Sequence, residues 1–123
     1  MKKILIVDDD MEILRLMGKK LKQSKFKVLA ATSGKEALII AETSQPDLIL
    51  LDIAMPEMDG YQTCEKLRQD SKTKDLRVLF LTGKELEPEG INQRCQDLGA
   101  CGHISKLSSL KDLTQKIKEA LSE

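Results

Sequence analysis

The sequence has few aromatic residues and no net charge. Its only aromatic side chains are Phe26, Tyr61 and Phe80, so a surface that stacks bases or sugars is not expected. Lysine plus arginine and aspartate plus glutamate number 20 each. This balance removes the electrostatic reason to expect a nucleic acid or an anionic membrane as partner.

Long apolar runs and clustered cysteines are also missing. No apolar run approaches the ~20 residues of a membrane span, and the run over residues 4–7 meets three aspartates too early for a signal peptide. Cys64, Cys95 and Cys101 are odd in number and scattered, which argues against a disulfide framework or a zinc site. We therefore expect buried, reduced thiols in a cytoplasmic protein. Residues 1–123 suffice for one domain, and we expect no separate output domain.

The stretch PDLILLDIAMPEMDG, residues 46–60, organises the rest of the chain. Residues 48–51 are all apolar, which is typical of a strand buried on both faces of a parallel sheet. Asp52 ends this run and therefore lies at the carboxyl end of the strand, the edge where open α/β sheets bind ligands. The residues that follow it form a loop.

Strand and helix patterns alternate five times along the chain. We predict strands at residues 3–7, 26–30, 48–51, 76–81 and 101–104. Helices between and after them are marked by apolar residues at helical spacing: Ile13, Leu14, Met17 and Leu21; Ala37, Leu38 and Ala41; Tyr61, Cys64 and Leu67; Ile91, Cys95 and Leu98; Leu110, Leu113, Ile117 and Leu121. Such alternation predicts an α/β fold, a three-layer α/β/α sandwich around a parallel sheet, with a crevice where the winding reverses.

Local signals indicate where the helices begin and end. Asp10 is the expected cap of the first helix, Ser33 or Thr32 of the second, and Ser108 or Ser109 of the last. A polar loop with Pro88 and Gly90 precedes the fourth helix, which Gly99 ends. Both Met11 and Met17 are assigned to the core, whereas Met55 and Met58 pack beside the site.

Polar residues follow four of the five predicted strands. Asp8 and Asp9 end the first, Asp52 the third and Thr82 the fourth, and Lys106 comes just after the fifth. Because parallel strands share one carboxyl edge, we expect these side chains to meet there. Clustered carboxylates need a positive partner, and oxygen ligands without histidine or cysteine favour Mg²⁺. The set predicts a Mg²⁺-assisted site in which an aspartate accepts a phosphoryl group.

Four motifs, ILIVDDD, LILLDIAMPEMDG, FLTG and HISK, resemble those of the receiver domains of two-component response regulators. The resemblance extends over the whole chain and implies a flavodoxin-like sheet with strand order 2-1-3-4-5. It implies a signalling module that receives a phosphoryl group from a sensor histidine kinase or a phosphotransfer protein. Such a module catalyses its own phosphorylation and dephosphorylation and signals by binding a downstream protein. It is a monomer, or a weak dimer through the face formed by the fourth helix, fifth strand and fifth helix.

The same resemblance assigns roles to individual residues. Asp52 resembles the phosphoacceptor, and Asp8 and Asp9 resemble the metal-binding acidic pair, with Asp9 the main direct ligand. The backbone carbonyl of Ala54 would be a further metal ligand. Thr82 and Lys106 resemble the phosphate-sensing hydroxyl and the phosphate-pairing lysine.

Three positions differ from the family pattern. Leu107 follows the lysine where the family usually has a proline joined by a cis bond, and Gly83 follows Thr82 where alanine is common. His103 replaces the usual aromatic residue of the switch, so we expect a weaker, pH-sensitive conformational response. In the family, the positions of Ala54 and Lys84 border the path of the water that hydrolyses the aspartyl phosphate.

Three other functions were compared with that of a receiver domain: a phosphatase, a nucleotide-binding domain and an unreactive scaffold. A Mg²⁺-dependent phosphatase of the haloacid dehalogenase type needs a second aspartate two residues after the nucleophile. Ala54 occupies that position after Asp52; Asp8 does have Asp10, but Glu12 stands where that family has threonine. A nucleotide-binding Rossmann domain lacks its glycine-rich fingerprint here. An unreactive scaffold does not account for the complete residue set.

Overall fold

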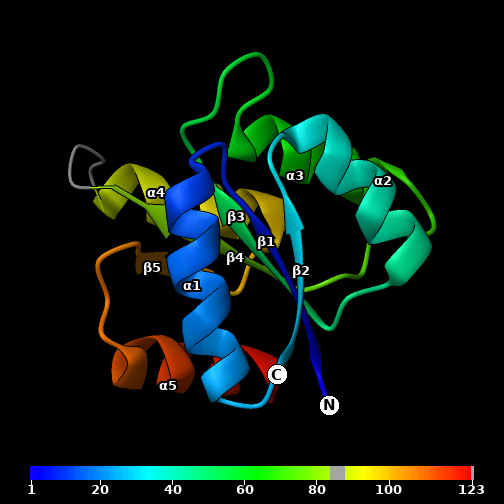
Figure 1. Ribbon diagram of the computed structural model, residues 1–123. Coiled ribbons are helices and arrows are strands. Elements are labelled where there is room, and N and C mark those ends of the chain that lie inside the picture. Colours follow the sequence, from blue (N-terminus) through cyan, green and yellow to red (C-terminus); the bar gives the residue numbers. More distant parts are fainter. Residues whose placement is uncertain (84–87, 123) are drawn as a thin grey trace.

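Five parallel strands form the centre of the fold, and helices cover both faces of the sheet (Figure 1). The computed structural model describes residues 1–83 and 88–122. The strands are β1 (Lys3–Val7), β2 (Lys27–Ala31), β3 (Leu48–Asp52), β4 (Val78–Thr82) and β5 (Gly102–Ser105). Their order in the sheet is β2-β1-β3-β4-β5, which confirms the predicted topology.

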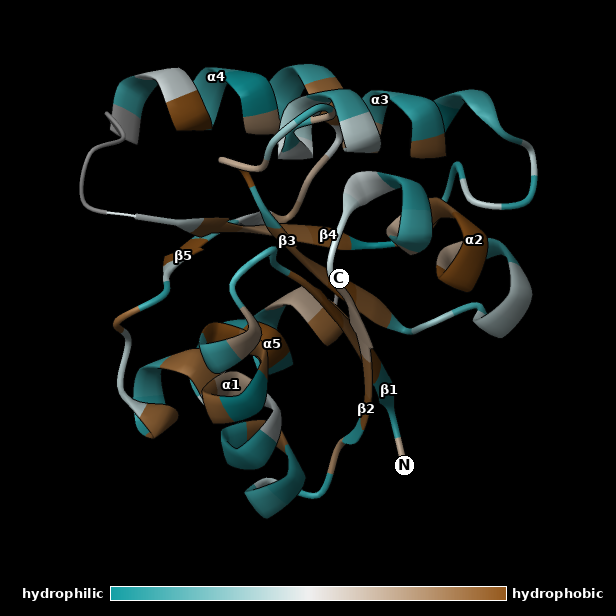
Figure 2. Cartoon of the chain, turned by 45° about the horizontal axis from the view of Figure 1, so that its top comes forward, coloured by the Kyte–Doolittle hydropathy of each residue, from teal (hydrophilic) through white to brown (hydrophobic). Residues whose placement is uncertain are grey.

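Five helices complete the three layers. They are α1 (Met11–Gln23), α2 (Gly34–Ser44), α3 (Gly60–Gln69), α4 (Pro88–Leu98) and α5 (Leu110–Leu121). Helices α1 and α5 lie on one face of the sheet, and α2, α3 and α4 lie on the other (Figure 2). Within the described residues, no helix is long and apolar enough to cross a membrane.

The core lies in two clusters, one on each side of the sheet. Every residue of β3 and β4 is buried, as the apolar run at 48–51 predicted. Alternate side chains of β3 serve opposite clusters: Ile49 and Leu51 face α2, α3 and α4, whereas Leu48 and Leu50 face α1 and α5. Burial on both faces holds the central strands rigid and therefore fixes the position of whatever follows them.

The helix caps agree with the sequence signals and show which of the two candidate residues caps α2 and which caps α5. The Asp10 carboxylate accepts a hydrogen bond from the Glu12 N–H at 2.9 Å. Ser33 caps α2 and Ser109 caps α5, each by accepting from a backbone N–H three residues ahead at 3.1 Å. A side-chain acceptor at this position satisfies an N–H group that has no partner inside the helix.

Several predicted boundaries are shifted. The second strand begins at Lys27, not at Phe26, because the Phe26 N–H donates to Leu21 O and closes the turn after α1. The fourth strand begins at Val78, since Leu76 still belongs to a turn in which its N–H donates to Thr73 O. The fifth covers Gly102–Ser105 instead of residues 101–104.

The fourth helix was predicted to follow a loop containing Pro88 and Gly90. It begins at Pro88 and includes Gly90. Proline is favoured at the first helical position, because its missing N–H would have no partner inside the helix there. Gly99 ends α4 as expected, with a φ of 64° that a glycine adopts without strain.

Two residues assigned to the apolar stripes lie outside the core. Met11 is 67% exposed, because the first residue of α1 is off the buried stripe formed by Leu14, Met17 and Leu21. In α5 Leu110 is 36% exposed, while Leu113 and Ile117 are buried as predicted.

The three cysteines are free thiols. Cys64 and Cys95 are buried, and Cys101 is partly exposed. Burial raises the pKa of Cys64 and of Cys95, which keeps both thiols protonated at neutral pH.

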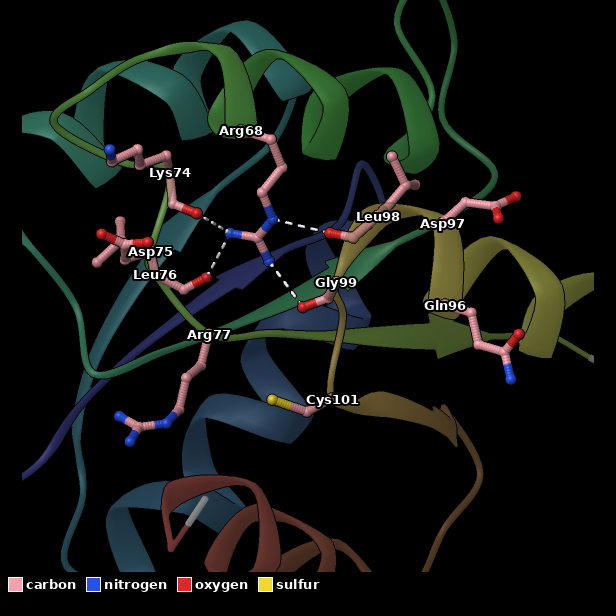
Figure 3. Close-up of a pocket in the computed structure, with 10 residues that line it drawn as sticks. All are labelled: Arg68, Lys74, Asp75, Leu76, Arg77, Gln96, Asp97, Leu98, Gly99 and Cys101. Carbon is pink, nitrogen blue, oxygen red and sulfur yellow. Dashed lines mark hydrogen bonds between the residues drawn. The ribbon is translucent and has the colours of Figure 1, made fainter.

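Arg68 of α3 joins three segments near the amino ends of the strands. Its guanidinium donates to the backbone carbonyls of Leu98, Lys74, Leu76 and Gly99 at 2.8, 2.9, 2.7 and 3.2 Å (Figure 3). One side chain therefore fixes the end of α4 to α3 and to the segment that leads into β4. Only a planar guanidinium can offer donors in all these directions at once.

We predict that Arg68→Lys lowers the free energy of unfolding by about 1–3 kcal/mol, because an ammonium cannot reach all four carbonyls. Urea unfolding at pH 7 measures the change. Arg15→Lys is the control, since the Arg15 side chain is 78% exposed and pairs only loosely with Glu12; we expect a change within about 0.5 kcal/mol. Equal stability of the Arg68 and Arg15 variants would contradict the proposed anchoring.

Candidate functional site

The predicted acidic residues meet at the carboxyl edge of the sheet. Asp8 and Asp9 directly follow β1, and Asp52 is the last residue of β3, the strand paired with β1. One carboxylate oxygen from each of the three lies within 4.8 Å of the other two. Asp8 and Asp52 are buried, whereas Asp9 is exposed.

Lys106 supplies the positive charge that this cluster needs. It follows β5, and its ammonium lies 3.0 Å from Asp8 Oδ2 and 3.1 Å from Asp52 Oδ1. The Lys106 side chain is only 20% exposed, so this interaction is weakly screened by solvent. The Lys106 N–H donates to Thr82 O, which fixes the start of the loop after β5 against the end of β4.

The lysine does not fully compensate for the buried negative charge. Burial, followed by repulsion from Asp8, raises the pKa of Asp52 from 3.8 to about 6, although Lys106 and the Ala54 N–H act in the opposite direction. For Lys106, burial opposes the charge, but the hydrogen bonds to Asp8 and Asp52 outweigh it and raise the pKa. At neutral pH Lys106 is therefore charged, and Asp52 is ionised at an electrostatic cost.

This arrangement fits a divalent cation. Within the described residues, Asp52 Oδ2 is buried without a hydrogen-bond partner, and Asp8 Oδ2 lies 3.0 Å from the Lys106 ammonium. A buried oxygen without a partner is costly unless a cation or water satisfies it. The donors are all hard carboxylate oxygens, the ligands that Mg²⁺ prefers. Asp8, Asp9 and Asp52 are thus the described residues that could hold it.

Gly60 holds the loop after Asp52 against the strand. A Cβ at Gly60 would lie 2.2 Å from Asp52 O and 2.8 Å from Ile53 Cα, so no other residue fits without moving the backbone that carries Asp52. The Gly60 N–H donates to Ile53 O at 2.8 Å. From sequence, Gly60 was assigned only to a turn, since its close approach depends on how α3 packs on β3.

The remaining predicted residues lie around the cluster. Thr82 is buried at the end of β4, and its hydroxyl makes a long 3.4 Å hydrogen bond to Ile104 O. Ala54 is exposed and donates its N–H to Asp52 Oδ1 at 3.3 Å. Among the described residues no peptide bond is cis, so the Lys106–Leu107 bond is trans. Lys84 lies outside the described residues.

His103 of β5 lies on the surface next to α4, away from the carboxylates. Its Nε2 is 3.0 Å from Asn92 Oδ1. Partial burial, and then the nearby charge of Lys116, lowers the pKa of His103 below its usual value of 6.5. The imidazole is therefore neutral at pH 7. Asn92 could not be predicted from the sequence, because no local pattern indicates which helix residue faces a strand side chain.

A separate pocket opens at the other end of β4, lined by residues that include Arg68, Arg77 and Cys101 (Figure 3). The Arg68 guanidinium in this pocket is occupied by four backbone carbonyls. It holds none of the predicted site residues, so the carboxyl edge remains the candidate site.

A five-stranded parallel sheet in the order 2-1-3-4-5 is flavodoxin-like, and the acidic cluster at its carboxyl edge is of the kind found in phosphoryl-accepting signalling domains. Residues 4–118 match the family described as response regulator receiver domain. The chain belongs to this family, the receivers of two-component systems, in which aspartate phosphorylation and Mg²⁺ binding are typical.

The similar proteins include a transcriptional regulator and a probable enzyme. The alkaline phosphatase synthesis transcriptional regulatory protein PhoP of Bacillus subtilis is 38% identical over 120 residues, which cover 98% of this chain and 48% of PhoP. A probable cyclic di-GMP phosphodiesterase of Vibrio cholerae is 40% identical over 93% of this chain and 25% of its own length. The chain therefore spans about half, or less, of the length of these relatives.

Solved structures of similar size also match. The chemotaxis protein CheY4 of Vibrio cholerae has a TM-score of 0.89 and 30% identity, with 98% of each chain covered. A putative response regulator from Chloroflexus aurantiacus also has a TM-score of 0.89 and 30% identity, covering 99% of this chain. Both likenesses confirm the receiver fold.

We predict that Asp52→Asn stabilises the protein in metal-free buffer at pH 7 by about 1–3 kcal/mol. The pKa of Asp52 is raised from 3.8 to about 6 in the folded protein, so its ionisation lowers stability progressively as the pH rises from 3.8 to about 6, and the full loss remains at higher pH. The gain should disappear near pH 4, where wild-type Asp52 becomes protonated. Added Mg²⁺ should also reduce it, because the wild-type carboxylate then gains a partner. Thermal unfolding with EDTA or Mg²⁺ measures both effects.

Asp75→Asn is the matched control, because Asp75 is exposed and far from the cluster in sequence and fold. It should change stability by less than about 0.5 kcal/mol under every condition. An Asp52→Asn protein that is less stable than wild type in EDTA would show that Lys106 fully compensates the buried charge.

Proposed function

We propose that the chain accepts a phosphoryl group on Asp52 from a phosphohistidine of a sensor kinase or phosphotransfer protein. It then signals by phosphorylation-dependent binding of another protein. The observation that carries the proposal is the buried Asp52 carboxylate, with one oxygen lacking a hydrogen-bond partner, between acidic neighbours and Lys106. The surroundings of Asp52 suit a nucleophile whose charge is poorly compensated until a phosphoryl group and a cation arrive.

In the proposed transfer, a carboxylate oxygen of Asp52 attacks the phosphorus atom of the donor. A new O–P bond forms while the P–N bond to the donor imidazole breaks and its electron pair returns to that ring. Lys106, which already contacts both Asp8 and Asp52, would pair with a phosphoryl oxygen. The Thr82 hydroxyl, which makes a long 3.4 Å hydrogen bond to Ile104 O, would donate to another phosphoryl oxygen.

Asp8, Asp9 and Asp52 would hold the Mg²⁺ in this proposal, with the Ala54 carbonyl as a further ligand. The cation supplies positive charge for the phosphoryl oxygens during transfer. Asp9 would be its main direct ligand because it is the exposed member of the pair, while the buried Asp8 holds Lys106.

The phosphatase alternative has less support. It needs Asp10 as acid and base two residues after a nucleophilic Asp8. The Asp10 carboxylate is occupied as the cap of α1, and Asp8 is buried against Lys106. Sustained turnover of a phosphomonoester would favour this alternative over the receiver role.

For the output we propose the face formed by α4, β5 and α5, used by a partner protein or a weak dimer. His103 and Asn92 lie there, and their hydrogen bond ties β5 to α4. Thr82 is on the neighbouring strand β4, two residue pairs beyond Phe80, the residue paired with His103. A displacement of Thr82 toward a phosphoryl group would thus act on the strand that carries His103.

We predict that Asp52 is the single residue phosphorylated by a small phosphodonor such as acetyl phosphate in the presence of Mg²⁺. Mass spectrometry after borohydride reduction of the acyl phosphate locates the adduct. EDTA should reduce labelling strongly, because three carboxylates then face the incoming phosphate without a cation.

Asp75→Asn is again the control and should be labelled like the wild type. Undiminished labelling of Asp52→Asn, or labelling that proceeds equally well in EDTA, would refute the assignment of the acceptor or of the metal.

We predict a small conformational response at β5 on addition of beryllofluoride with Mg²⁺. A neutral imidazole is smaller than a tyrosine ring, and it loses its hydrogen bond to Asn92 if it moves inward. The inward conformation of His103 is therefore stabilised only slightly, and phosphorylation shifts the population little. Backbone NMR shifts should change mainly in the loops after Asp52 and Thr82. At a pH below the lowered pKa of His103, protonation of the imidazole should weaken the response further.

His103→Tyr is the comparison variant and should respond more strongly, independently of pH. A large, pH-independent change throughout α4 and β5 of the wild type would contradict the weak switch.

A further inference from the structure

A groove lies between α1 and β2, on the flank of the sheet away from β5. Exposed basic side chains line its helical side, and the groove has a volume of about 600 Å³. Val28 and Ala30 of β2, with Leu14 and Gly18 of α1, form its less polar floor. None of these residues belongs to the carboxylate site.

In the part of the chain that the structure describes, one side of β2 has no partner strand, because β2 is the edge of the sheet (Figure 1). The Lys27 N–H donates to Lys2 O, and Ala31 O accepts from the Asp8 N–H. Hydrogen bonding in a strand alternates from one residue to the next, so Val28 and Ala30 direct their N–H and C=O groups away from β1. These are the two strand residues that line the groove.

The groove is positively charged although the chain is neutral. Between residues 11 and 30 there is one acidic residue, Glu12. The basic residues in this range are Arg15, Lys19, Lys20, Lys22, Lys25 and Lys27. Glu12 lies 3.6 Å from Arg15, and within the described chain Lys19 and Lys22 have no acidic partner.

The spacing of these cations is close to that of an extended chain. Arg15, Lys19 and Lys22 are each about one helical turn apart, with a rise of about 6 Å from Arg15 to Lys19 and about 4.5 Å from Lys19 to Lys22. Side chains on one face of a strand recur every ~6.7 Å. A strand laid along β2 would therefore place every second side chain near one of the three cations.

Charge also selects among possible occupants. A second copy of this β2 would bring Lys25 and Lys27 against the same residues, and like charges oppose such pairing. An acidic strand gains both backbone hydrogen bonds and ion pairs.

We propose that the groove between α1 and β2 binds an extended, acidic segment of a partner protein, with glutamate or aspartate at alternate positions, which adds to β2 as a sixth strand. The open backbone groups of Val28 and Ala30 would pair with the segment, as in other cases of strand addition. Arg15, Lys19 and Lys22 would recognise its carboxylates. This contact goes beyond the proposed phosphoryl transfer, since it uses neither the carboxylate site nor the face that contains His103.

The test uses isotope-labelled, unphosphorylated protein and a six-residue peptide of alternating glutamate and threonine with blocked ends. We expect saturable NMR shifts at the Val28 and Ala30 amides and along α1, weakened by added salt. The same peptide N-methylated at alternate residues keeps its charge and loses backbone donors; it should bind at least ~tenfold more weakly. A lysine–threonine peptide should not bind.

Two variants separate charge from strand pairing. Lys19→Glu with Lys22→Glu should weaken binding at least ~tenfold, whereas Lys111→Glu with Lys118→Glu on the exposed surface of α5 should leave it unchanged. Ala30→Pro removes one outward N–H and leaves the hydrogen bonds to β1 in place, so it should abolish binding while the protein remains folded. If Ala30→Pro does not fold, the N-methylated peptide tests the same point.

Three results would overturn the proposal. One is equal binding of the N-methylated peptide, which would indicate charge attraction alone. Another is a shift of the same amides by a DNA duplex or by anionic vesicles but not by the acidic peptide. The third is a concentration-dependent dimer that the double reversal of Lys19 and Lys22 abolishes. Each is independent of phosphorylation, so Asp52 labelling can succeed or fail separately.

Discussion

The contact of the Lys106 ammonium with Asp8 and Asp52 is the interaction on which the carboxyl edge of the sheet depends. It joins the ends of β1, β3 and β5, and without it two buried carboxylates would repel each other with little screening. The lysine only partly compensates them, as the raised pKa of Asp52 indicates. The folded site therefore retains negative charge that Lys106 does not compensate, as suits a site that binds a cation together with a phosphoryl group.

The rest of the fold supports this contact by holding its components still. The doubly buried β3 fixes Asp52, the close approach of Gly60 fixes the backbone just beyond it, and the backbone hydrogen bond from Lys106 to Thr82 fixes the lysine. At the opposite end of the strands, Arg68 fixes the end of α4. Between these two ends, the tie of α4 to β5 through Asn92 and His103 is a single hydrogen bond.

Much of the fold and of the site was predictable because the signals are local. A four-residue apolar run predicts a doubly buried strand, the residue after it must lie at the carboxyl edge, and parallel strands bring such residues together; Asp8, Asp9, Asp52, Thr82 and Lys106 were found in this way. Strand order came from the family resemblance. Boundaries such as those of β2 and β4 were shifted because turns competed for the same backbone groups, and Met11 is exposed because a helix end departs from the buried stripe.

The sequence by itself determined which side chains end each strand, since alternation and apolar runs are properties of neighbouring residues. Only the tertiary structure decided that Lys106 contacts both Asp8 and Asp52, that Asn92 faces His103, and that Gly60 touches the backbone of Asp52. It likewise decided that the basic residues of α1 border the open edge of β2. These contacts join residues far apart in the chain, and their distances depend on how helices pack on the sheet, which no local pattern encodes.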